Sequence, residues 1–134
     1  MSAHYLFAYG TLRRAVPNSM HSLLAGKAEY MGDAWISGCL YDAGGYPGLS
    51  FSGGAGSHVK GEVYRLLEPH ATLRDLDDYE QCSPKHPEPH EYRRVLVSLQ
   101  MDNGESVKAW CYEYLHATRG LRLIQGGDYA ACFP

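Results

Sequence analysis

Tyr5-Leu6-Phe7-Ala8-Tyr9-Gly10-Thr11-Leu12, at residues 5–12, most constrains the fold, because an apolar run leads directly into a glycine-containing turn. This pattern is typical of a strand over about residues 4–9 that ends in a tight turn. Glycine lets the backbone approach a ligand closely, and exposed N–H groups of a turn can bind a carboxylate or carbonyl oxygen. We therefore expect a substrate-binding turn over Tyr9–Leu12, with an ordinary strand-ending turn as the alternative.

A short helix is predicted soon after this turn. Pro17-Asn18-Ser19 supplies residues that cap a helix at its N-terminus, and Met20, Leu23 and Leu24 form an apolar stripe. Gly26 is a natural end for this helix, because glycine readily adopts the left-handed conformation that closes helices.

A second helix is predicted to begin at Pro69, since proline is tolerated in the first turn of a helix. Leu73, Leu76 and Tyr79 recur at the three-residue spacing of one buried face. Glu80 therefore comes at the C-terminal end of this helix.

The strongest strand signal is a β-hairpin in the second half of the chain. Residues 91–100 and 106–115 are joined through Asn103-Gly104, a dipeptide that favours a type I′ turn. Alternation along each strand puts the following side chains on common faces: Val95, Val97 and Leu99 on the first strand, and Trp110, Tyr112 and Tyr114 on the second. The second strand thus presents an aromatic face.

Other strand-like segments lie at residues 28–32, 35–42 and 59–66, and the stretch 42–48 is rich enough in glycine to be a loop. Many short strands with two helices among them favour an α+β domain built around a curled, partly closed sheet. A barrel-like cavity is then expected. The segment from Leu121 to Tyr129 is expected only to pack against the rest of the domain.

The size and charge of the chain limit the classes of function. Its 134 residues suffice for one domain, 1–134, and one active site. Lys and Arg number 12 against 15 Asp and Glu, a net charge of −3 without long runs of one sign. This weak charge argues against nucleic acid and anionic membranes as partners. Oligomeric state is left open.

The N-terminus lacks the basic-then-apolar layout of a secretory signal, and no stretch approaches the roughly 18 apolar residues of a membrane span, so a cytoplasmic protein is expected. The four cysteines are scattered without a Cys-x-x-Cys pair, which favours reduced, mostly buried thiols.

The sequence disfavours a metal site, a phosphate-binding loop and a serine hydrolase. Cys82-x-x-x-His86-x-x-x-His90 has metal-ligand residue types, but Pro87 and Pro89 preclude a regular helix that would bring them together, so no metal is expected. Gly53-Gly54-Ala55-Gly56 lacks the Lys-Ser/Thr ending of a phosphate loop. No Gly-x-Ser-x-Gly motif indicates a serine hydrolase.

Six sequence blocks together resemble the gamma-glutamylcyclotransferase-like family, including its gamma-glutamylamine cyclotransferase branch and small bacterial members. In chain order they are Tyr9-Gly10-Thr11-Leu12, Gly44-Gly45-Tyr46-Pro47-Gly48, Lys60-Gly61-Glu62-Val63-Tyr64, Leu76-Asp77-Asp78-Tyr79-Glu80, Tyr92-Arg93-Arg94 and Ala109-Trp110-Cys111-Tyr112. The resemblance spans nearly the whole chain. It implies a small mixed β-barrel whose cavity takes a gamma-glutamyl group, and it differs at Gln81, where relatives often have glycine.

The resemblance further implies that Glu80 is the catalytic acid–base group. Such an enzyme cyclises a gamma-glutamyl amide or gamma-glutamyl amino acid to 5-oxoproline, releases the amine and needs no cofactor. Some similar small proteins lack the glutamate, so a non-catalytic binding or structural domain is the alternative function.

Tyr46 and Tyr114 are candidate cavity residues, although an aromatic residue on a strand is by default part of the core. Arg94 is a candidate for binding a substrate carboxylate, with pairing to a nearby Asp as the structural alternative.

A base that works near neutral pH needs a carboxyl pKa well above the ordinary value of about 4.3. Burial of Glu80 would raise its pKa, and so would the helix C-terminus and the neighbouring Asp77 and Asp78. The alternative is a solvated residue at a frayed helix end, where charge repulsion is screened.

Overall fold

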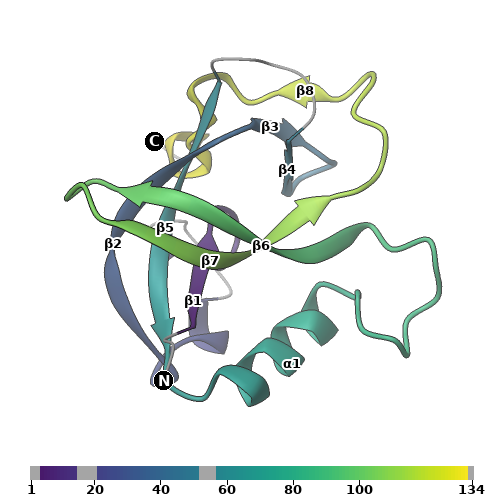
Figure 1. Ribbon diagram of the computed structural model, residues 1–134. Coiled ribbons are helices and arrows are strands. Elements are labelled where there is room, and N and C mark those ends of the chain that lie inside the picture. The colour runs from purple at the N-terminus through teal and green to yellow at the C-terminus, as the bar shows by residue number, and fades with distance from the viewer. Residues whose placement is uncertain (1–3, 15–20, 52–56, 133–134) are drawn as a thin grey trace.

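The structure is a computed structural model that describes residues 4–14, 21–51 and 57–132. Five strands close into a ring in the order β1-β5-β2-β6-β7, and β7 pairs again with β1 (Figure 1). Neighbouring strands of this ring are antiparallel except for β1 and β7, which are parallel. The bounds are β1 Tyr5–Ala8, β2 Ala28–Ser37, β5 His58–Leu66, β6 Tyr92–Met101 and β7 Ser106–Tyr114. The chain thus forms the small mixed α+β barrel that its sequence predicts.

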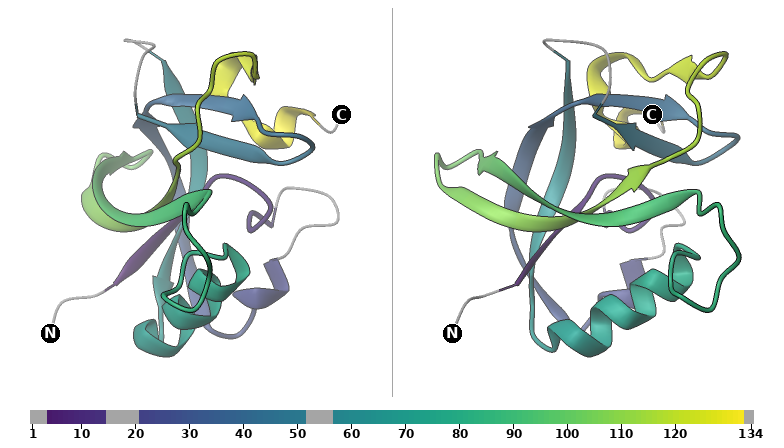
Figure 2. Two further views of the ribbon diagram at one scale, coloured as in Figure 1. Left: turned by 90° about the vertical axis from the view of Figure 1, so that its right-hand side faces the viewer. Right: turned by 45° about the vertical axis from the view of Figure 1, so that its right-hand side comes forward.

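Three shorter strands extend the sheet beyond the ring: β3 Cys39–Asp42, β4 Pro47–Ser50 and β8 Arg122–Leu123. The one α-helix among the described residues, α1 Pro69–Tyr79, lies outside the barrel, at the end away from β3, β4 and β8 (Figure 2). Three 3-10 turns complete the described elements: η1 His21–Leu23, η2 Gln125–Gly127 and η3 Tyr129–Cys132. None of the helices in the described ranges has both the length and the apolar character needed to span a bilayer.

Two separate apolar clusters stabilise the fold. The first fills the barrel, with buried side chains such as Phe7, Val63 and Cys111. The second lies between the barrel wall and α1 and includes Leu6 and Leu76. Because strand side chains alternate, adjacent residues of one strand serve different clusters. Side chains of the first cluster therefore occupy the interior of the barrel.

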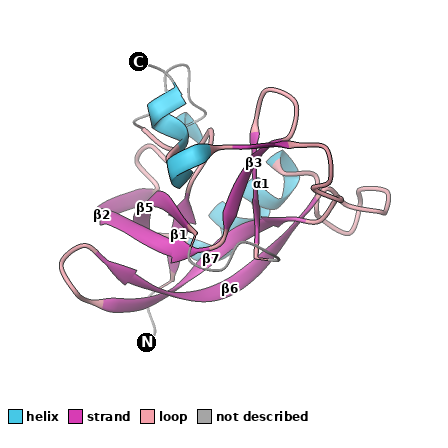
Figure 3. Ribbon diagram, turned by 90° about the horizontal axis from the view of Figure 1, so that it is seen from above, coloured by secondary structure: helices cyan, strands magenta, loops and turns pink. Residues whose placement is uncertain are grey.

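The predicted hairpin is confirmed, and β6 and β7 run side by side along one side of the molecule (Figure 3). The predicted faces are confirmed too, because Tyr112 and Tyr114 join the cluster under α1 while Leu99 lies in the barrel. The turn type was wrong. Gly104 N–H donates to the Met101 carbonyl at 2.9 Å, and within this loop only Gly104 has a positive φ, of 91°. This is a three-residue loop with a glycine bulge.

The helix predicted after Pro17 lies largely outside the described residues. Its described part is only the 3-10 turn η1, and Leu24 beyond it is buried at 1% exposure. The second helix is confirmed as α1, with Leu73 and Leu76 buried as predicted. Tyr79 instead remains 36% exposed, because the end of α1 projects past the apolar cluster toward the Thr11 hydroxyl, 3.0 Å from the Tyr79 hydroxyl.

The segmentation of strands at residues 28–42 was also wrong. Strand β2 continues through residues 33 and 34, with a bulge between Tyr30 and Gly32. The interruption between β2 and β3 lies at Gly38 instead. The predicted loop 42–48 is shorter than expected, since β4 begins at Pro47. Gly48 lies in β4, and a glycine is needed there because a Cβ would lie 2.6 Å from the Tyr114 ring. The Gly53 to Gly56 stretch lies outside the described residues.

Candidate active site

A cavity of about 550 Å³ lies beside the barrel, where the turn after β1 meets the end of α1. Its lining includes the end of β1 and its turn, residues 7–12, and Glu80 and Gln81 at the end of α1. The segment 86–92 supplies most of the remaining lining, and Tyr46 and Pro47 contribute to it as well. The cavity therefore brings together the turn and the glutamate that the sequence singled out.

The C-terminus of α1 fixes the backbone that carries Glu80. Gln81 adopts a left-handed conformation, with φ of 56°, and its N–H donates to the Asp78 carbonyl at 3.1 Å. The Cys82 N–H donates to the Asp77 carbonyl at 3.0 Å. These two bonds form a Schellman motif, which ends the helix in a defined geometry. Glu80 thus stands at an ordered helix end rather than a frayed one.

Replacement of Gln81 by Gly is expected to stabilise the protein by about 1 kcal/mol, because a side chain in the left-handed region is strained and glycine is not. The measurement is urea unfolding of both proteins. Arg74→Gly is the matched control, since this exposed residue is inside α1. There glycine should destabilise the protein by about 1 kcal/mol. Equal destabilisation by both substitutions would contradict the assigned strain.

The environment of Glu80 raises its pKa from 4.5 to about 7. Burial is the larger cause, as predicted, because it penalises the charged form. The second cause is the charge of Glu91, which also lines the cavity, so the expected contribution of Asp77 and Asp78 was wrong. Both of these are engaged elsewhere, Asp78 with Lys85 at 3.2 Å. Within the described ranges, the Glu80 carboxyl has no hydrogen-bond partner.

The turn after β1 is held in place by its neighbours. The Tyr9 hydroxyl donates to the Tyr112 carbonyl at 2.6 Å and accepts from the Leu49 N–H at 3.2 Å. Gly10 lies so close to Pro47 that a Cβ would be 2.7 Å from the proline ring. Thr11 is hydrogen-bonded to the end of α1. A rigid turn results.

The turn also has free hydrogen-bond donors. In the part of the chain that the structure describes, the Thr11 and Leu12 N–H groups have no acceptor. Both residues line the cavity. Two unpaired amides next to a cavity are suited to bind an oxygen of a ligand.

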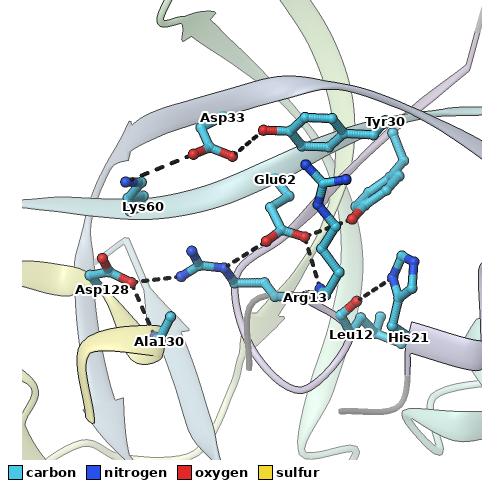
Figure 4. Close-up of polar contacts among 11 residues, drawn as sticks. Leu12, Arg13, His21, Tyr30, Asp33, Lys60, Glu62, Asp128 and Ala130 are labelled. Carbon is cyan, nitrogen blue, oxygen red and sulfur yellow. Dashed lines mark hydrogen bonds and ion pairs between the residues drawn. The ribbon is translucent and has the colours of Figure 1, made fainter. Parts of the chain in front are cut away.

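A buried polar network anchors the far end of the turn (Figure 4). The Arg13 side chain, 2% exposed, donates from Nη1 to Asp128 Oδ1 at 2.8 Å, and its Nε lies 3.5 Å from Glu62 Oε2. Glu62 Oε1 accepts from the Arg14 N–H at 2.9 Å and from the Tyr64 hydroxyl at 2.6 Å. Glu62 thus binds two successive residues of the turn's exit.

Sequence reasoning missed this network. Its signal is the position of Glu62 in the strand 59–66, where Glu62, Tyr64 and Leu66 share a face that is otherwise apolar. A lone carboxylate on a buried strand face needs a cation or several donors nearby.

Of the three further candidates, Tyr46 lines the cavity and its hydroxyl donates to Glu91 Oε2. Tyr114 does not line it, because its ring is buried against the edge of Tyr92, with centroids 5.5 Å apart. The hydroxyl of Tyr92 is bonded to the Pro47 carbonyl at 2.8 Å.

Arg94 lies outside the cavity, and the structural alternative holds for it. It binds Asp77 through two hydrogen bonds, Nε to Oδ1 at 2.9 Å and Nη2 to Oδ2 at 3.2 Å, and stacks over Trp110 at 4.5 Å. The Tyr112 hydroxyl donates to the same carboxylate at 2.7 Å. Arg94 therefore braces α1 against β7.

The segment from Cys82 to His90 contributes part of the cavity wall, through residues 86, 87, 89 and 90. His86 Nδ1 lies 2.8 Å from the Ser83 hydroxyl, and His90 Nε2 lies 3.2 Å from the His86 carbonyl. Cys82 Sγ lies 4.0 Å from Asp77. Among the residues with described positions, no three His, Cys, Asp or Glu side chains are grouped for a metal ion.

Comparisons with known proteins give a consistent picture. The family model "Gamma-glutamyl cyclotransferase, AIG2-like" matches residues 6–131. Gamma-glutamylcyclotransferase family protein YtfP of Escherichia coli (strain K12) is 35% identical over 125 residues, which cover 92% of this chain and 94% of that protein. Gamma-glutamylaminecyclotransferase of Mus musculus is 32% identical over 129 residues, covering 85% and 78%.

Solved structures agree with this match. A crystal structure of an AIG2-like protein from Mus musculus superposes with a TM-score of 0.72 at 29% identity and covers 93% of this chain and 88% of that one. A solution NMR structure of YtfP from Escherichia coli has a TM-score of 0.65 at 35% identity, covering 93% and 95%.

Proposed function

The chain belongs to the gamma-glutamyl cyclotransferase, AIG2-like family, and on this premise we propose that it converts a gamma-glutamyl amide or gamma-glutamyl amino acid to 5-oxoproline and the free amine. Glu80 acts as the general base and then as the general acid. The reaction requires no cofactor.

The chemistry is an intramolecular acyl transfer. The α-nitrogen of the substrate attacks the γ-carbonyl carbon, and the bond from that carbon to the distal nitrogen breaks. The attacking nitrogen loses two protons in total, and the departing nitrogen gains two and leaves as an ammonium ion. A single carboxylate can carry these protons from one nitrogen to the other. Holding the substrate in a ring-ready conformation supplies much of the acceleration, since effective molarities reach about 10⁵ M or more.

The observation that carries this proposal is the unpaired Glu80 carboxyl, which lines the same cavity as two unpaired backbone amides. A carboxyl whose pKa is raised to about 7 is half ionised near neutral pH, so it can both accept and return a proton. The Thr11 and Leu12 N–H groups are placed to stabilise the oxyanion that forms at the γ-carbonyl.

The test is to incubate the purified protein with gamma-glutamyl amines, gamma-glutamyl amino acids and glutathione, without added cofactor and with a metal chelator. Mass spectrometry then detects 5-oxoproline. Release from at least one substrate class is the expected result. No release from any of them would favour the alternative, a non-catalytic binding or structural domain with the same cavity.

The rate should depend on pH through Glu80. Because the ionised carboxylate is the base and its pKa is about 7, kcat/KM should rise with pH through about 7 and fall about tenfold per unit well below it. The measurement is kcat/KM between about pH 5 and pH 8. Activity recovered after incubation at pH 5 and return to pH 8 is the control for unfolding. A midpoint near the unperturbed 4.5 would contradict the role of Glu80 as base.

A further inference from the structure

Apart from three imidazoles and the tyrosine hydroxyls, the ionisable groups that line the cavity are acidic. Among the described residues of its lining, Glu80 and Glu91 carry carboxylates, and none is Lys or Arg. The guanidinium of Arg94 is paired with Asp77 outside the cavity. Anionic groups of a ligand therefore depend on the backbone amides of the turn, which lie at the Glu80 end.

Glu91 is fixed at another part of the cavity wall. Its carbonyl accepts from the Leu115 N–H at 2.7 Å, which ties its backbone to the end of β7. Its Oε2 accepts from the Tyr46 hydroxyl, whereas its Oε1 has no partner in the described ranges. One oxygen is thus used to hold the carboxylate in place, and the other remains available to a ligand.

The negative charge of Glu91 raises the pKa of several groups in and near the cavity wall. It contributes to the raised pKa of Glu80, which is about 7, and of Tyr46, which is about 12. It also raises the pKa of Tyr114 behind the wall. A field that reaches these groups also reaches a ligand that lies between them.

We propose that Glu91 is a specificity residue that selects gamma-glutamyl substrates whose leaving amine carries a second, positively charged group. This inference rests on the proposed function and names its substrate class. The unpaired Oε1 accepts from the cation, and the Tyr46 ring beside it adds a cation–π surface. A leaving group that carries a free carboxylate meets repulsion from Glu91, with no Lys or Arg in the described lining to offset it.

The test uses three gamma-glutamyl amides of similar length, made from 1,4-diaminobutane, pentylamine and 4-aminobutanoic acid. Their leaving groups end in a cation, a methyl group and an anion. Wild type should turn over the cationic amide with a kcat/KM at least about tenfold above that of the anionic amide. Glu91→Gln should bring this ratio close to one, and Glu91→Lys should invert it.

The ratio of two substrates isolates the effect of the leaving group. A change in the pKa of Glu80 on removing the Glu91 charge affects all three amides alike and cancels. The charge states of His86, His90 and His116 in the cavity wall do not enter the comparison, because these residues are the same in every variant. Glu88→Gln is the matched control, because this exposed acid on the same segment does not line the cavity, and it should leave the ratio unchanged.

Failure of this inference is distinguishable from failure of the proposed function. If wild type releases 5-oxoproline but its ratio equals that of Glu91→Gln, Glu91 does not select the leaving amine and the inference is overturned. If no amide is turned over, the proposed function fails, and calorimetric Kd values for the three amides test the selectivity instead. Tighter binding of the cationic amide by wild type than by Glu91→Gln supports the inference, and equal Kd ratios overturn it.

Discussion

Replacement of Glu80 by Gln is expected to lower the rate of 5-oxoproline formation by at least about 10²-fold, the usual effect of deleting an acid–base group. Gln has nearly the same shape and keeps the contacts of the helix end, but it cannot take a proton from the substrate ammonium. The loss should therefore fall on kcat more than on KM. The measurement is steady-state kinetics with mass-spectrometric detection of the product.

The matched control is Glu68→Gln, an exposed acid just before α1 at the end opposite Glu80, which should retain wild-type kinetics. Equal turnover by wild type and Glu80→Gln would refute the assignment of the base.

The same variant should be more stable than wild type above neutral pH. The pKa of Glu80 is about 7 in the folded protein against 4.5 ordinarily, so the folded state holds a proton that the unfolded chain releases between these values. Wild type therefore loses stability as pH rises from about 4.5 to about 7, whereas the Gln variant has no such pH-dependent loss at this position. Its advantage should be on the order of 2 kcal/mol at about pH 8 and vanish near pH 4. Urea unfolding at both values measures it, and a less stable variant at pH 8 would point to misfolding.

Replacement of Arg13 by Ala should destabilise the protein by about 3–5 kcal/mol, because it leaves the Glu62 carboxylate buried without its cation. Arg13 is also the residue whose N–H closes the turn by donating to the Gly10 carbonyl at 3.0 Å. Urea unfolding gives the stability.

Arg65→Ala is the matched control for this prediction. The Arg65 pair with Glu29 is exposed, at 41% and 54%, and exposed ion pairs contribute only about 0–1 kcal/mol. A double variant that replaces Arg13 by Met and Glu62 by Leu should recover much of the lost stability, because the buried carboxylate is then removed as well and the remaining one, Asp128, is 28% exposed to solvent. Similar losses for Arg13→Ala and Arg65→Ala would show that burial of the pair does not decide its contribution.

The parts of the fold that the sequence predicts are those with a strong periodic signal. Alternation in β7 and the three-residue spacing of Leu73 and Leu76 each reflect one buried face, and such patterns are set by local geometry. Strand β4 could not be predicted in this way. All four of its residues are buried, and its Pro47-Gly48 start resembles a turn. Glycine is required there by the ring of Tyr114, which comes from a distant strand.

The same distinction applies to the candidate site. Glu80 and the Tyr9–Leu12 turn were identified together from motifs, and the structure places both on one cavity. The pairing of Arg94 depends on how α1 docks against β7, which no local pattern encodes. Glu91 escaped notice because it lies in an irregular proline-containing segment, where residue spacing does not predict direction.

The separation of the two apolar clusters has a consequence for how such proteins diversify. The barrel is complete without the segment 81–91, which borders the reaction chamber but belongs to no strand of the ring. Insertions, deletions or charge swaps in that segment can reshape the chamber while the scaffold keeps its packing. Exchange of this segment between relatives is accordingly a direct route to new selectivities on an unchanged framework.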